Sequence, residues 1–467
     1  MIATTLIVYL VVLLAIGVWA QRRIGDTTDF HLAGRRMGPV VAALSASASS
    51  SSAWTLLGMS GAAYAWGLQA VWLIPAVVSG FFINWVFIAP RLQPASHQSQ
   101  ALTLVEFLGQ GSGNEGLLRS LGAAIILFCF TFYIAAQFQA AGTAISTALP
   151  VDASAAMIVG AVIVIVYVFL GGFWAASVTD ALQGLMMLAV ALILPLVALA
   201  AVGGPAALWQ GLQAVGDPSL VRLVDQPGLL LAMVFVAGLF GIGLGYPGQP
   251  HVVNRFMALE SAGQIRFARN VALAWAAMIY IGMVVLGWSG RVLLPELADG
   301  ESVLLQLSVD LLPAVLGGII TGGVLAAIMS TSDSQLLVAG SAVSHDLRRG
   351  RISLAMDRVV IVALGIAAVV LALYFPATIF DRVLFAWQAL GNAFGPLLII
   401  LLFCGPVAPR YRLAAVGIGF ALTVAISFFP QAPGNAVERL VPFFIALGIA
   451  WTGYRTARQG VIRTSRG

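Results

Sequence analysis

The sequence contains no lysine, only two cysteines, and few charged residues of any kind. Arginine therefore supplies all 23 basic side chains of the 467-residue chain. Charged residues make up 9% of the sequence, whereas a soluble domain carries about a quarter. The mean hydropathy is +1.00. Such a chain cannot cover a water-facing surface with polar groups, so these shortages exclude an ordinary soluble protein and predict a multi-span membrane protein.

The missing residue types also exclude several kinds of site. Cys129 and Cys404 lie far apart in apolar runs, which excludes a disulfide framework or a cysteine metal site. The arginines are scattered, so no nucleic-acid partner is expected. The serines of the apolar segments lack a neighbouring histidine or lysine base, which argues against an enzyme. No obligatory protein partner is evident. The composition alone points to the lipid bilayer as the environment of the chain.

Thirteen apolar stretches are long enough to cross about 30 Å of hydrocarbon. They fall at residues 2–20, 38–66, 68–90, 117–149, 154–172, 176–202, 229–250, 268–294, 310–345, 358–376, 380–404, 412–429 and 438–457. In the first stretch the basic residues Arg22 and Arg23 follow the apolar run, which indicates a retained span rather than a signal peptide. In the loop after the third stretch, residues 103–109 suggest a short interfacial helix, with a plain surface loop as the alternative.

The distribution of arginines predicts the orientation of the chain. Cytoplasmic loops are enriched in positive charge. If the N-terminus lies outside the cell, the opposite side holds only four of the 23 arginines, which are Arg222, Arg291, Arg382 and Arg439. The other arginines fall in loops predicted to be cytoplasmic, and Arg255 is one of them. This division predicts an external (periplasmic) N-terminus and a cytoplasmic C-terminus.

Two of the predicted spans contain segments that are unsuitable for a regular membrane helix. Residues 45–53 hold six serines, and residues 238–250 hold five glycines and two prolines. Non-helical backbone at membrane depth survives only where it faces protein or a water-filled cavity. The breaks are five spans apart, so 38–202 and 229–404 form two repeats of opposite orientation, with 2–20 and 412–457 as additional helices. Transporters built from inverted repeats bind solute and ion at such paired breaks.

A stripe of hydroxyl groups on the ninth span predicts an ion site. Ala327, Ser330, Thr331 and Ser334 follow helical spacing and lie on one face. Hard cations such as sodium prefer oxygen ligands, and unwound carbonyls near Ala48 and Ser51 complete a possible set. Packing of helices through small residues is the alternative.

Further polar and aromatic residues are candidates for a second cation site and a solute site. Asp180 and Asp333 are carboxylates at or near membrane depth and by default candidate functional groups; with Ser334 they form a possible second cation site or release path. Structural carboxylates are the alternative. Tyr133 and Gln137 share a face of the fourth span, and Tyr246 lies in the second break. Packing remains the alternative for these aromatic residues.

The sequence resembles the sodium/solute symporter family, and within it the sodium/proline symporters. The stretches that resemble it are LAGRRMGPVVAALSASASSSSAW (32–54), ALTLVEF (101–107), FLGGFWAASVTDALQG (169–184), GLGYPGQPHVVNRFMA (243–258), LAAIMSTSDSQLLV (325–338) and FAWQALGNAFGP (385–396). The resemblance implies a LeuT-like fold of five-plus-five inverted repeats with extra helices, and sodium-driven uptake by alternating access. It also implies a sodium site formed by Ala48, Ser51, Ala327, Ser330 and Thr331.

Two positions depart from the pattern of the proline symporters. An aspartate that is important for sodium in those proteins corresponds to Ser50, and a tryptophan of their solute site corresponds to Ile242. Tyr133, Tyr246 and Pro250 are retained.

We therefore expect a single transmembrane transporter domain that imports a small solute with Na+, proline or a related amino acid being the first choice. The predicted solute site comprises Ser52, Trp54, Tyr133, Gln137, Tyr246 and Pro250. A sodium- or proton-coupled carrier for another carboxylate or zwitterion is the first alternative. A membrane receptor or a channel is the alternative of another class.

Overall fold

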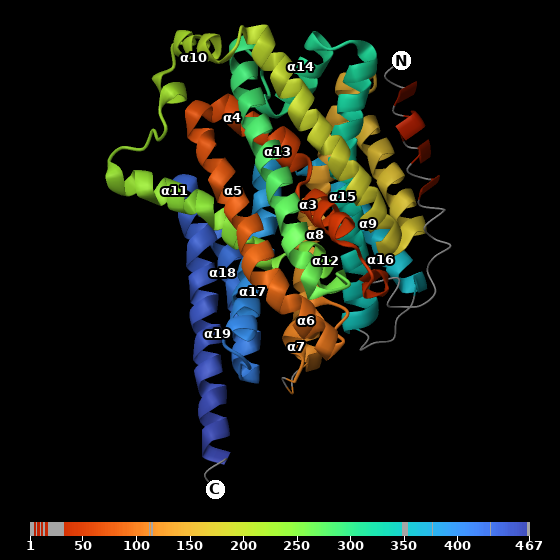
Figure 1. Ribbon diagram of the computed structural model, residues 1–467, viewed down its shortest axis with the longest axis vertical. Helices are drawn as coiled ribbons and strands as arrows, with labels where there is room; N and C mark the ends of the chain where they lie inside the picture. The colour runs from red at the N-terminus through yellow and green to blue at the C-terminus, as the bar shows by residue number, and fades with distance from the viewer. Residues whose placement is uncertain are drawn as a thin grey trace.

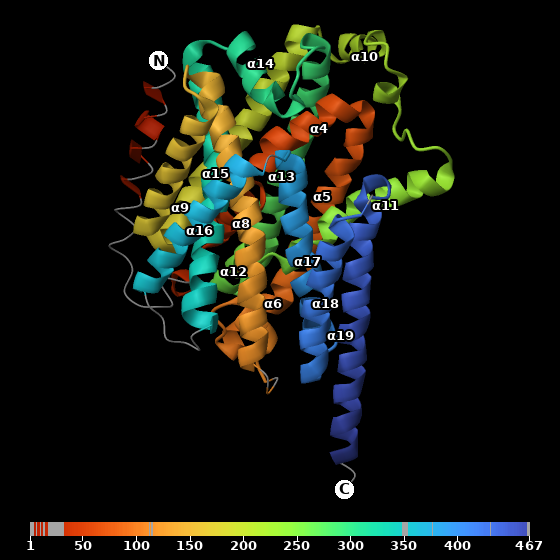
Figure 2. The ribbon, with the colours of Figure 1, turned by 180° about the vertical axis from the view of Figure 1, so that it is seen from behind.

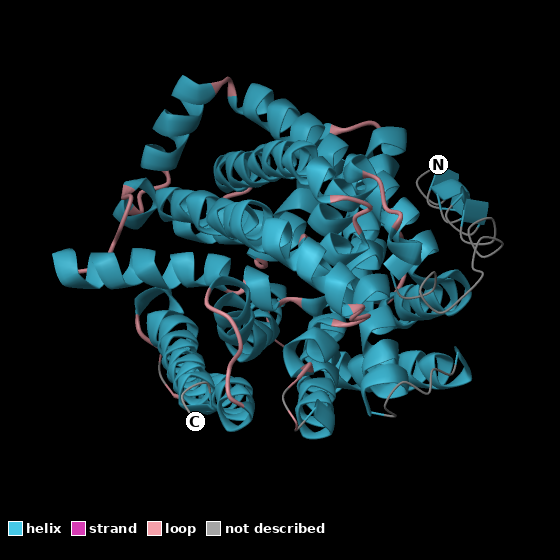
Figure 3. Ribbon diagram, turned by 60° about the horizontal axis from the view of Figure 1, so that its bottom comes forward, coloured by secondary structure: helices cyan, strands magenta, loops and turns pink. Residues whose placement is uncertain are grey.

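The computed structural model describes residues 32–464, except 112, 114, 348–353, 376 and 430, together with scattered residues between 4 and 16. Every regular element in this part of the chain is a helix (Figure 3), and the only pairing of β type is an isolated bridge between Met37 and Leu259. The predicted all-helical class is therefore confirmed for the described residues. Most of the predicted span at 2–20 lies outside them.

The long helices form one elongated bundle (Figure 1 and, from behind, Figure 2). They are α8 (Glu115–Ala148), α9 (Ala153–Val202), α13 (Ile265–Leu293), α15 (Ala314–Ser341), α16 (Leu354–Tyr374), α17 (Ile379–Phe403), α18 (Pro409–Ser427) and α19 (Ala436–Thr464). The bundle centre contains α3 (Pro39–Ser50) and α15, both of which pack against α9. Every residue of α15 from Ile320 to Ser341 is buried, although the helix contains many hydroxyl groups.

The described residues contain fewer long apolar helices than the thirteen predicted spans. Among the described residues, ten helices are long and apolar enough to cross a membrane. The predicted spans at 154–172 and 176–202 both lie in α9, in which Ala176–Val202 is one of the ten and Ala153–Val166 is a shorter apolar helix. The second predicted span is divided into shorter helices. A count of thirteen is therefore not confirmed.

The first predicted break is present in the structure. Helix α3 ends at Ser50, and Ser51 leaves the helical region with φ −117° and ψ 83°. The chain becomes helical again in η2 (Trp54–Gly58), a π-helical turn, and continues as α4 (Met59–Trp66). It then turns at Gly67, whose φ is +59° and whose Cβ position would lie 2.3 Å from the carbonyl oxygen of Leu220. Both features require glycine there.

The second break follows α11 (Leu229–Leu244). A short 3-10 turn, η6 (Tyr246–Gly248), leads to Gln249 with extended φ/ψ of −91° and 103°. Helix α12 (Pro250–Ala258) then begins with proline at its first position, where a missing N–H has no consequence. Glycines at this break let α17 approach closely, because a Cβ on Gly391 would lie 2.5 Å from the Cα of Gly245.

The two broken segments run in opposite directions through the bundle. In Figure 1, α3 leads up to α4, whereas α11 leads down to α12. Their inner halves meet where the Met37 N–H donates to the Ala258 carbonyl at 3.1 Å and the Glu260 N–H donates to the Met37 carbonyl at 3.2 Å. The unwound residues Ser51, Ser52 and Gln249 are buried, so both breaks lie in the interior of the bundle.

The connecting segments contain short helices at both ends of the bundle. At the lower end in Figure 1, α6 (Ala89–Ser99) leads to α7 (Leu104–Gly109), which confirms the short helix expected at 103–109. At the upper end lie α10 (Pro205–Ala214), η5 (Pro218–Val221), η8 (Gly300–Ser302) and α14 (Val303–Leu311). Between the first break and α6, the chain forms η3 (Gly67–Trp72), α5 (Leu73–Phe82) and η4 (Ile83–Ile88).

Candidate ion and solute site

Oxygen atoms from the first break and from α15 converge, as the hydroxyl stripe predicts. The Ser330 hydroxyl lies 3.3 Å from the carbonyl oxygen of Ala48 and 3.2 Å from that of Ala327. The Thr331 hydroxyl lies 3.2 Å from the carbonyl oxygen of Ser49. All of these residues are fully buried. The structure thus brings together two hydroxyls and three main-chain carbonyls, which is the ligand chemistry that a hard monovalent cation requires.

Ser51, the remaining predicted ion ligand, is expected to contribute its main-chain carbonyl, and its side chain makes a separate contact. Its hydroxyl lies 3.1 Å from the phenolic oxygen of Tyr280 on α13, and the Thr55 hydroxyl lies 3.4 Å from the same atom. The Ser51 N–H donates to the Ala48 carbonyl. The side chain of Ser51 therefore ties the break to α13, and the carbonyl of Ser49 is the main-chain oxygen found beside Thr331.

The predicted solute residues of α8 contact the same break from the other side. The N–H of Ala53 donates to Gln137 Oε1 at 3.0 Å, and the Tyr133 hydroxyl donates to Ser52 Oγ at 3.3 Å. The amide nitrogen of Gln137 and the indole nitrogen of Trp54 are buried without a hydrogen-bond partner among the described residues. Two unpartnered buried donors therefore lie at this break, which favours a ligand that supplies acceptors.

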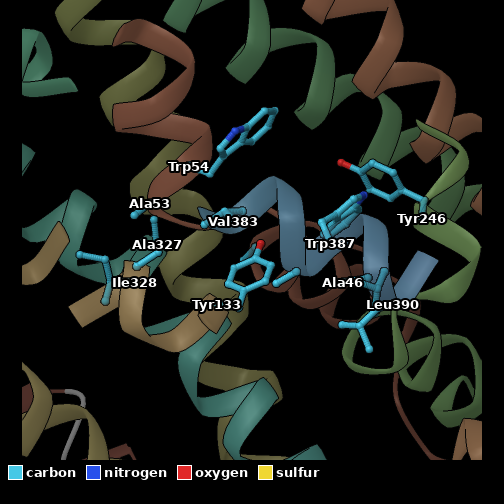
Figure 4. Packing of buried hydrophobic residues seen from close by; sticks show 14 of the residues in the cluster. Ala46, Ala53, Trp54, Tyr133, Tyr246, Ala327, Ile328, Val383, Trp387 and Leu390 are labelled. Atoms are coloured by element: carbon cyan, nitrogen blue, oxygen red, sulfur yellow. The ribbon is translucent and has the colours of Figure 1, made fainter. Parts of the chain in front are cut away.

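Aromatic rings close the space beside the second break. Tyr246 meets Trp387 of α17 edge to face, with ring centroids 4.6 Å apart, and meets Phe81 at 5.1 Å. Figure 4 shows Tyr133, Trp387 and Tyr246 near one another, with Trp54 above them. The ring of His251 lies 6.2 Å from that of Tyr133. Pro250 is buried at the start of α12, so all six predicted solute residues lie at or beside the two breaks.

Asp180 takes part in a buried network that joins four helices. Its Oδ2 accepts hydrogen bonds from Ser45 Oγ at 2.7 Å and Ser49 Oγ at 3.1 Å, and it forms an ion pair with Arg255 Nη2 at 2.9 Å. Asp180 and Arg255 are both completely buried. The prediction that Arg255 lies in a cytoplasmic loop is therefore wrong. Helix α12 extends through Arg255, and the paired carboxylate keeps the guanidinium inside the protein.

Asp333 and Ser334 of α15 border this network. Ser334 Oγ lies 3.0 Å from Ser49 Oγ, donates to Asp333 Oδ1 at 3.1 Å and accepts a hydrogen bond from Arg255. Asp180 Oδ1 and Asp333 Oδ2 are buried without a hydrogen-bond partner among the described residues. The sequence therefore correctly grouped Asp180, Asp333 and Ser334, but it did not predict that a guanidinium lies among them.

An aromatic stack closes the upper side of the first break. Phe380 of α17 lies between Trp54 and Trp66, with ring centroids 5.6 Å and 5.3 Å away. The carboxylate of Glu301 in η8 accepts the N–H groups of Ile379 at 2.9 Å and Phe380 at 2.8 Å. Burial raises the pKa of Glu301, although these two hydrogen bonds act to lower it. Glu301 thus fastens the first turn of α17 over the site.

The two positions that depart from the proline symporters are both satisfied locally. The Ser50 hydroxyl donates to the Ser47 carbonyl at 3.0 Å, within its own helix. Ile242 is buried in α11, and its carbonyl accepts the indole N–H of Trp387 at 3.1 Å. Neither residue supplies a charge or an aromatic ring to the site, so Asp180 and Asp333 are the carboxylates nearest to the predicted ion ligands.

Comparison with known proteins identifies the family. A model described as the Sodium:solute symporter family matches residues 30–419. The chain belongs to the sodium:solute symporter family. The High-affinity proline transporter PutP of Bacillus subtilis (strain 168) is 32% identical over 456 residues, which cover 93% of this chain and 95% of that protein. The Sodium/proline symporter of Escherichia coli (strain K12) is 32% identical over 459 residues, or 94% and 90% of the two chains.

Solved structures confirm the fold class. A Na+-coupled sialic acid symporter in a substrate-bound outward-open state aligns with a TM-score of 0.81 at 16% identity, covering 97% of this chain and 98% of that one. Mhp1, a nucleobase-cation-symport-1 family transporter in a closed conformation, aligns with a TM-score of 0.61 at 14% identity over 92% and 96% of the chains. The predicted LeuT-like fold is confirmed. Family membership makes the chain a sodium-coupled symporter in a membrane and not an enzyme.

Sequence reasoning missed several residues of the site. Arg255 was assigned to a loop because it follows the second break by only five residues, although α12 continues through it. Tyr280 and Trp387 lie within ordinary apolar runs, and no spacing signal distinguishes them from packing residues. Trp387 stands in a stretch that resembles the family, which is the one signal that pointed toward it. Glu301 lies far from α17 in the sequence, so its role in accepting the first N–H groups of α17 cannot be recognised from local sequence.

Proposed function

We propose that this protein imports proline or a closely related amino acid together with Na+. The observation that carries the proposal is the convergence of the Ala48, Ser49 and Ala327 carbonyls with the Ser330 and Thr331 hydroxyls at the first break. Relatives named as proline transporters cover almost the whole chain, which supports the choice of solute.

Sodium would bind between the first break and α15. The hydroxyls of Ser330 and Thr331 donate hydrogen bonds to main-chain carbonyls. A cation entering there would replace these hydrogen bonds and be coordinated by the two hydroxyl and three carbonyl oxygens. Because the ligands come from two different elements, sodium would join α3 to α15 and favour the conformation in which they lie together. A membrane potential adds about 2.3 kcal/mol per charge per 100 mV to inward movement.

The amino acid would bind between the two breaks. Its carboxylate is matched by the unpartnered donors of Gln137 and Trp54, and its apolar ring or side chain by Tyr133, Tyr246 and Trp387 (Figure 4). Ser52 and Pro250 border the same space on the two broken segments. Both ligands would contact residues 48–54, so each would stabilise the form of the break that the other requires, and such coupling is reciprocal.

We assign Asp180, Asp333 and Ser334 as a second cation site or release path. Asp180 is paired with Arg255, and one oxygen of each of the two buried carboxylates lacks a hydrogen-bond partner among the described residues. With both carboxylates ionised, the group would carry a net charge of −1. A further cation would balance this charge. Ser49 would connect the two sites, because its carbonyl faces Thr331 and its hydroxyl faces Asp180.

We infer that the N-terminus lies outside the cell and the C-terminus in the cytoplasm. Arg91 on α6, Arg119 at the start of α8 and Arg410 at the start of α18 gather at the lower end of the bundle in Figure 1. This end also contains the last turns of α19, with Arg455 and Arg458. The excess of arginine there supports a cytoplasmic location. We likewise propose 38–202 and 229–404 as the inverted repeats, supported by the opposite directions of the two broken helices.

The proposal is tested by uptake of labelled proline into proteoliposomes with an inward Na+ gradient, an inward H+ gradient or neither. The expected result is accumulation above the external concentration only with Na+. Competition by other amino acids and by carboxylates then ranks the solutes. Equal accumulation without Na+ would contradict sodium coupling, accumulation that follows pH would favour a proton-coupled carrier, and failure of proline to compete with another solute would contradict the choice of amino acid.

A further inference from the structure

A cavity of about 570 Å³ lies outside the ion and solute site, between α8, α16, α17, α18 and α19. This volume is in the range of about 300–1,000 Å³ that is usual for small-ligand sites. Much of its lining is apolar, with Phe128 and Phe132 of α8 beside Phe385 of α17. The ion and solute binding proposed above does not involve this cavity.

Four charged side chains line the same cavity, and no ion pair joins any of them to another described residue. They are Asp381 and Arg382 at the start of α17, and Glu438 and Arg439 at the start of α19. Arg382, Glu438 and Arg439 are each more than nine-tenths buried. Arg382 Nη1 donates to Gln139 Oε1 at 3.0 Å and Arg439 Nη1 donates to the Gly238 carbonyl at 3.3 Å, so both guanidinium groups contact only neutral acceptors. Buried charges of this kind are costly unless they are paired.

The cavity reaches from the ends of the helices toward the middle of the bundle. Helices α16 and α18 end beside it, and α17 and α19 begin beside it. Helix ends of spanning segments lie near the membrane–water interface, so the charged side chains are at headgroup level. Arg382 is held by Gln139, whereas Phe128 lies eleven residues earlier on α8, or about 16 Å along the helix. The apolar part therefore lies at the depth of acyl chains.

The mouth of the cavity is itself apolar and open. Phe375 is 64% exposed and Phe428 is 82% exposed, and both contribute to the cavity lining. Both rings lie just past the ends of α16 and α18, at the membrane interface, where aromatic side chains are enriched. A molecule would therefore enter from the bilayer, and it must present both charge signs at the level of the helix ends.

We propose that this cavity is a binding site for a phospholipid with a zwitterionic, primary-amine headgroup of the phosphatidylethanolamine type. Its phosphate is complementary to Arg382 and Arg439, and its ammonium group is complementary to Glu438 and Asp381. One acyl chain occupies the space lined by Phe128, Phe132 and Phe385. This lipid contacts α17 on one side and the additional helices α18 and α19 on the other. Helix α17 carries Phe380, which covers the solute site.

Native mass spectrometry of the full-length protein tests the proposal. Purified protein is delipidated and exposed to phosphatidylethanolamine, phosphatidylcholine or phosphatidylglycerol with identical acyl chains. Wild-type protein is expected to retain one phosphatidylethanolamine at least about tenfold more strongly than the other two lipids. The methylated choline cannot donate hydrogen bonds to the carboxylates, and the glycerol headgroup lacks the ammonium group.

Two variants address the headgroup and the chain separately. Glu438→Gln is expected to remove most of the tenfold preference, because one charge-assisted hydrogen bond is lost, whereas Glu296→Gln at an exposed position of the same end is expected to preserve it. Ser427→Trp fills the cavity without changing any charge and is expected to abolish retention of all three lipids. Thr452→Trp, on the exposed face of α19, is the matched control.

Three outcomes would overturn the proposal. The first is equal retention of the three lipids by the wild-type protein. The second is unchanged retention in Ser427→Trp. The third is formation of a dimer that excludes the lipid and is broken by Ser427→Trp, which would assign the surface to a second copy of the chain. Because retention is measured without transport, the result is independent of the sodium and proline assignments.

Discussion

Removal of the Arg255 guanidinium leaves two carboxylates, Asp180 and Asp333, in a buried space without their cation. Breaking a buried ion pair on one side typically costs about 3–5 kcal/mol. We therefore expect Arg255→Gln to lower the free energy of unfolding by about this amount. Asp180→Asn is expected to be milder, because Arg255 keeps its hydrogen bonds to Ser45, Ser334 and the His251 carbonyl.

A double-mutant cycle separates the ion pair from the packing of its two residues. Asp180→Asn combined with Arg255→Gln removes both charges, so the double variant is expected to be more stable than the sum of the single effects predicts. Residues in one buried network show coupling free energies of about 0.5–3 kcal/mol, and we expect the upper part of that range. The assay is equilibrium unfolding in mixed detergent micelles, followed by tryptophan fluorescence.

The exposed pair of Arg222 and Asp225 provides the control cycle. Its atoms are 2.7 Å apart, but the two side chains are 60% and 34% exposed, so a coupling of at most about 1 kcal/mol is expected. The reasoning would be refuted by additive effects at Asp180 and Arg255, or by a coupling no larger than that of the exposed pair. Either result would mean that the buried network stabilises the protein through packing and not through the interaction of its charges.

Three further predictions follow from the site and its surroundings. Glu301→Gln weakens two hydrogen bonds to the first turn of α17, each of which contributes about 1.5–3 kcal/mol when the acceptor is charged. That turn covers the site, so a cysteine introduced at Ala53 is expected to react faster with an external thiol reagent in the Glu301→Gln background. An unchanged rate would contradict a role of Glu301 in holding α17 over the site. Gln137→Ala removes an unpartnered donor and is expected to raise the proline concentration for half-maximal uptake about tenfold, whereas an unchanged value would remove Gln137 from the solute site. Burial acts to raise the pKa of Glu106, but hydrogen bonds and charges from His345, the Leu102 N–H and Arg119 outweigh burial and lower that pKa from 4.5 to about 2. Ionised Glu106 therefore contributes stability above pH 4.5, and this contribution is lost as the pH falls toward 2. In Glu106→Gln the melting temperature should fall less steeply between pH 4.5 and pH 2 than in the wild-type protein.

The apolar runs and the two breaks could be predicted from the sequence because lipid imposes a simple rule. Each backbone polar group at membrane depth must be satisfied internally, so six serines at 45–53 or five glycines at 238–250 are visible as exceptions. Helical spacing then places Ser330 and Thr331 on one face. Both observations need only local sequence, and the structure shows the hydroxyls facing the first break as expected.

The partners that cross between elements could not be predicted in the same way. Arg255 meets Asp180 only because α12 and α9 both pack against α3, and Tyr280 meets Ser51 only because α13 packs there. The count of thirteen spans is not confirmed, because hydropathy does not show at which residue a helix within an apolar run begins or ends. Such facts depend on packing in three dimensions.

The sodium dependence of proline uptake in three variants of α15 tests the central claim most directly. Ser330→Ala and Thr331→Ala each remove a hydroxyl that faces the first break, whereas Ser332→Ala on the same helix removes one that donates to the Ile328 carbonyl of its own helix at 2.7 Å. We expect the Na+ concentration for half-maximal uptake to rise about tenfold or more in the first two variants and to stay unchanged in Ser332→Ala. Equal sodium dependence in all three variants and the wild-type protein would contradict a sodium site between the first break and α15.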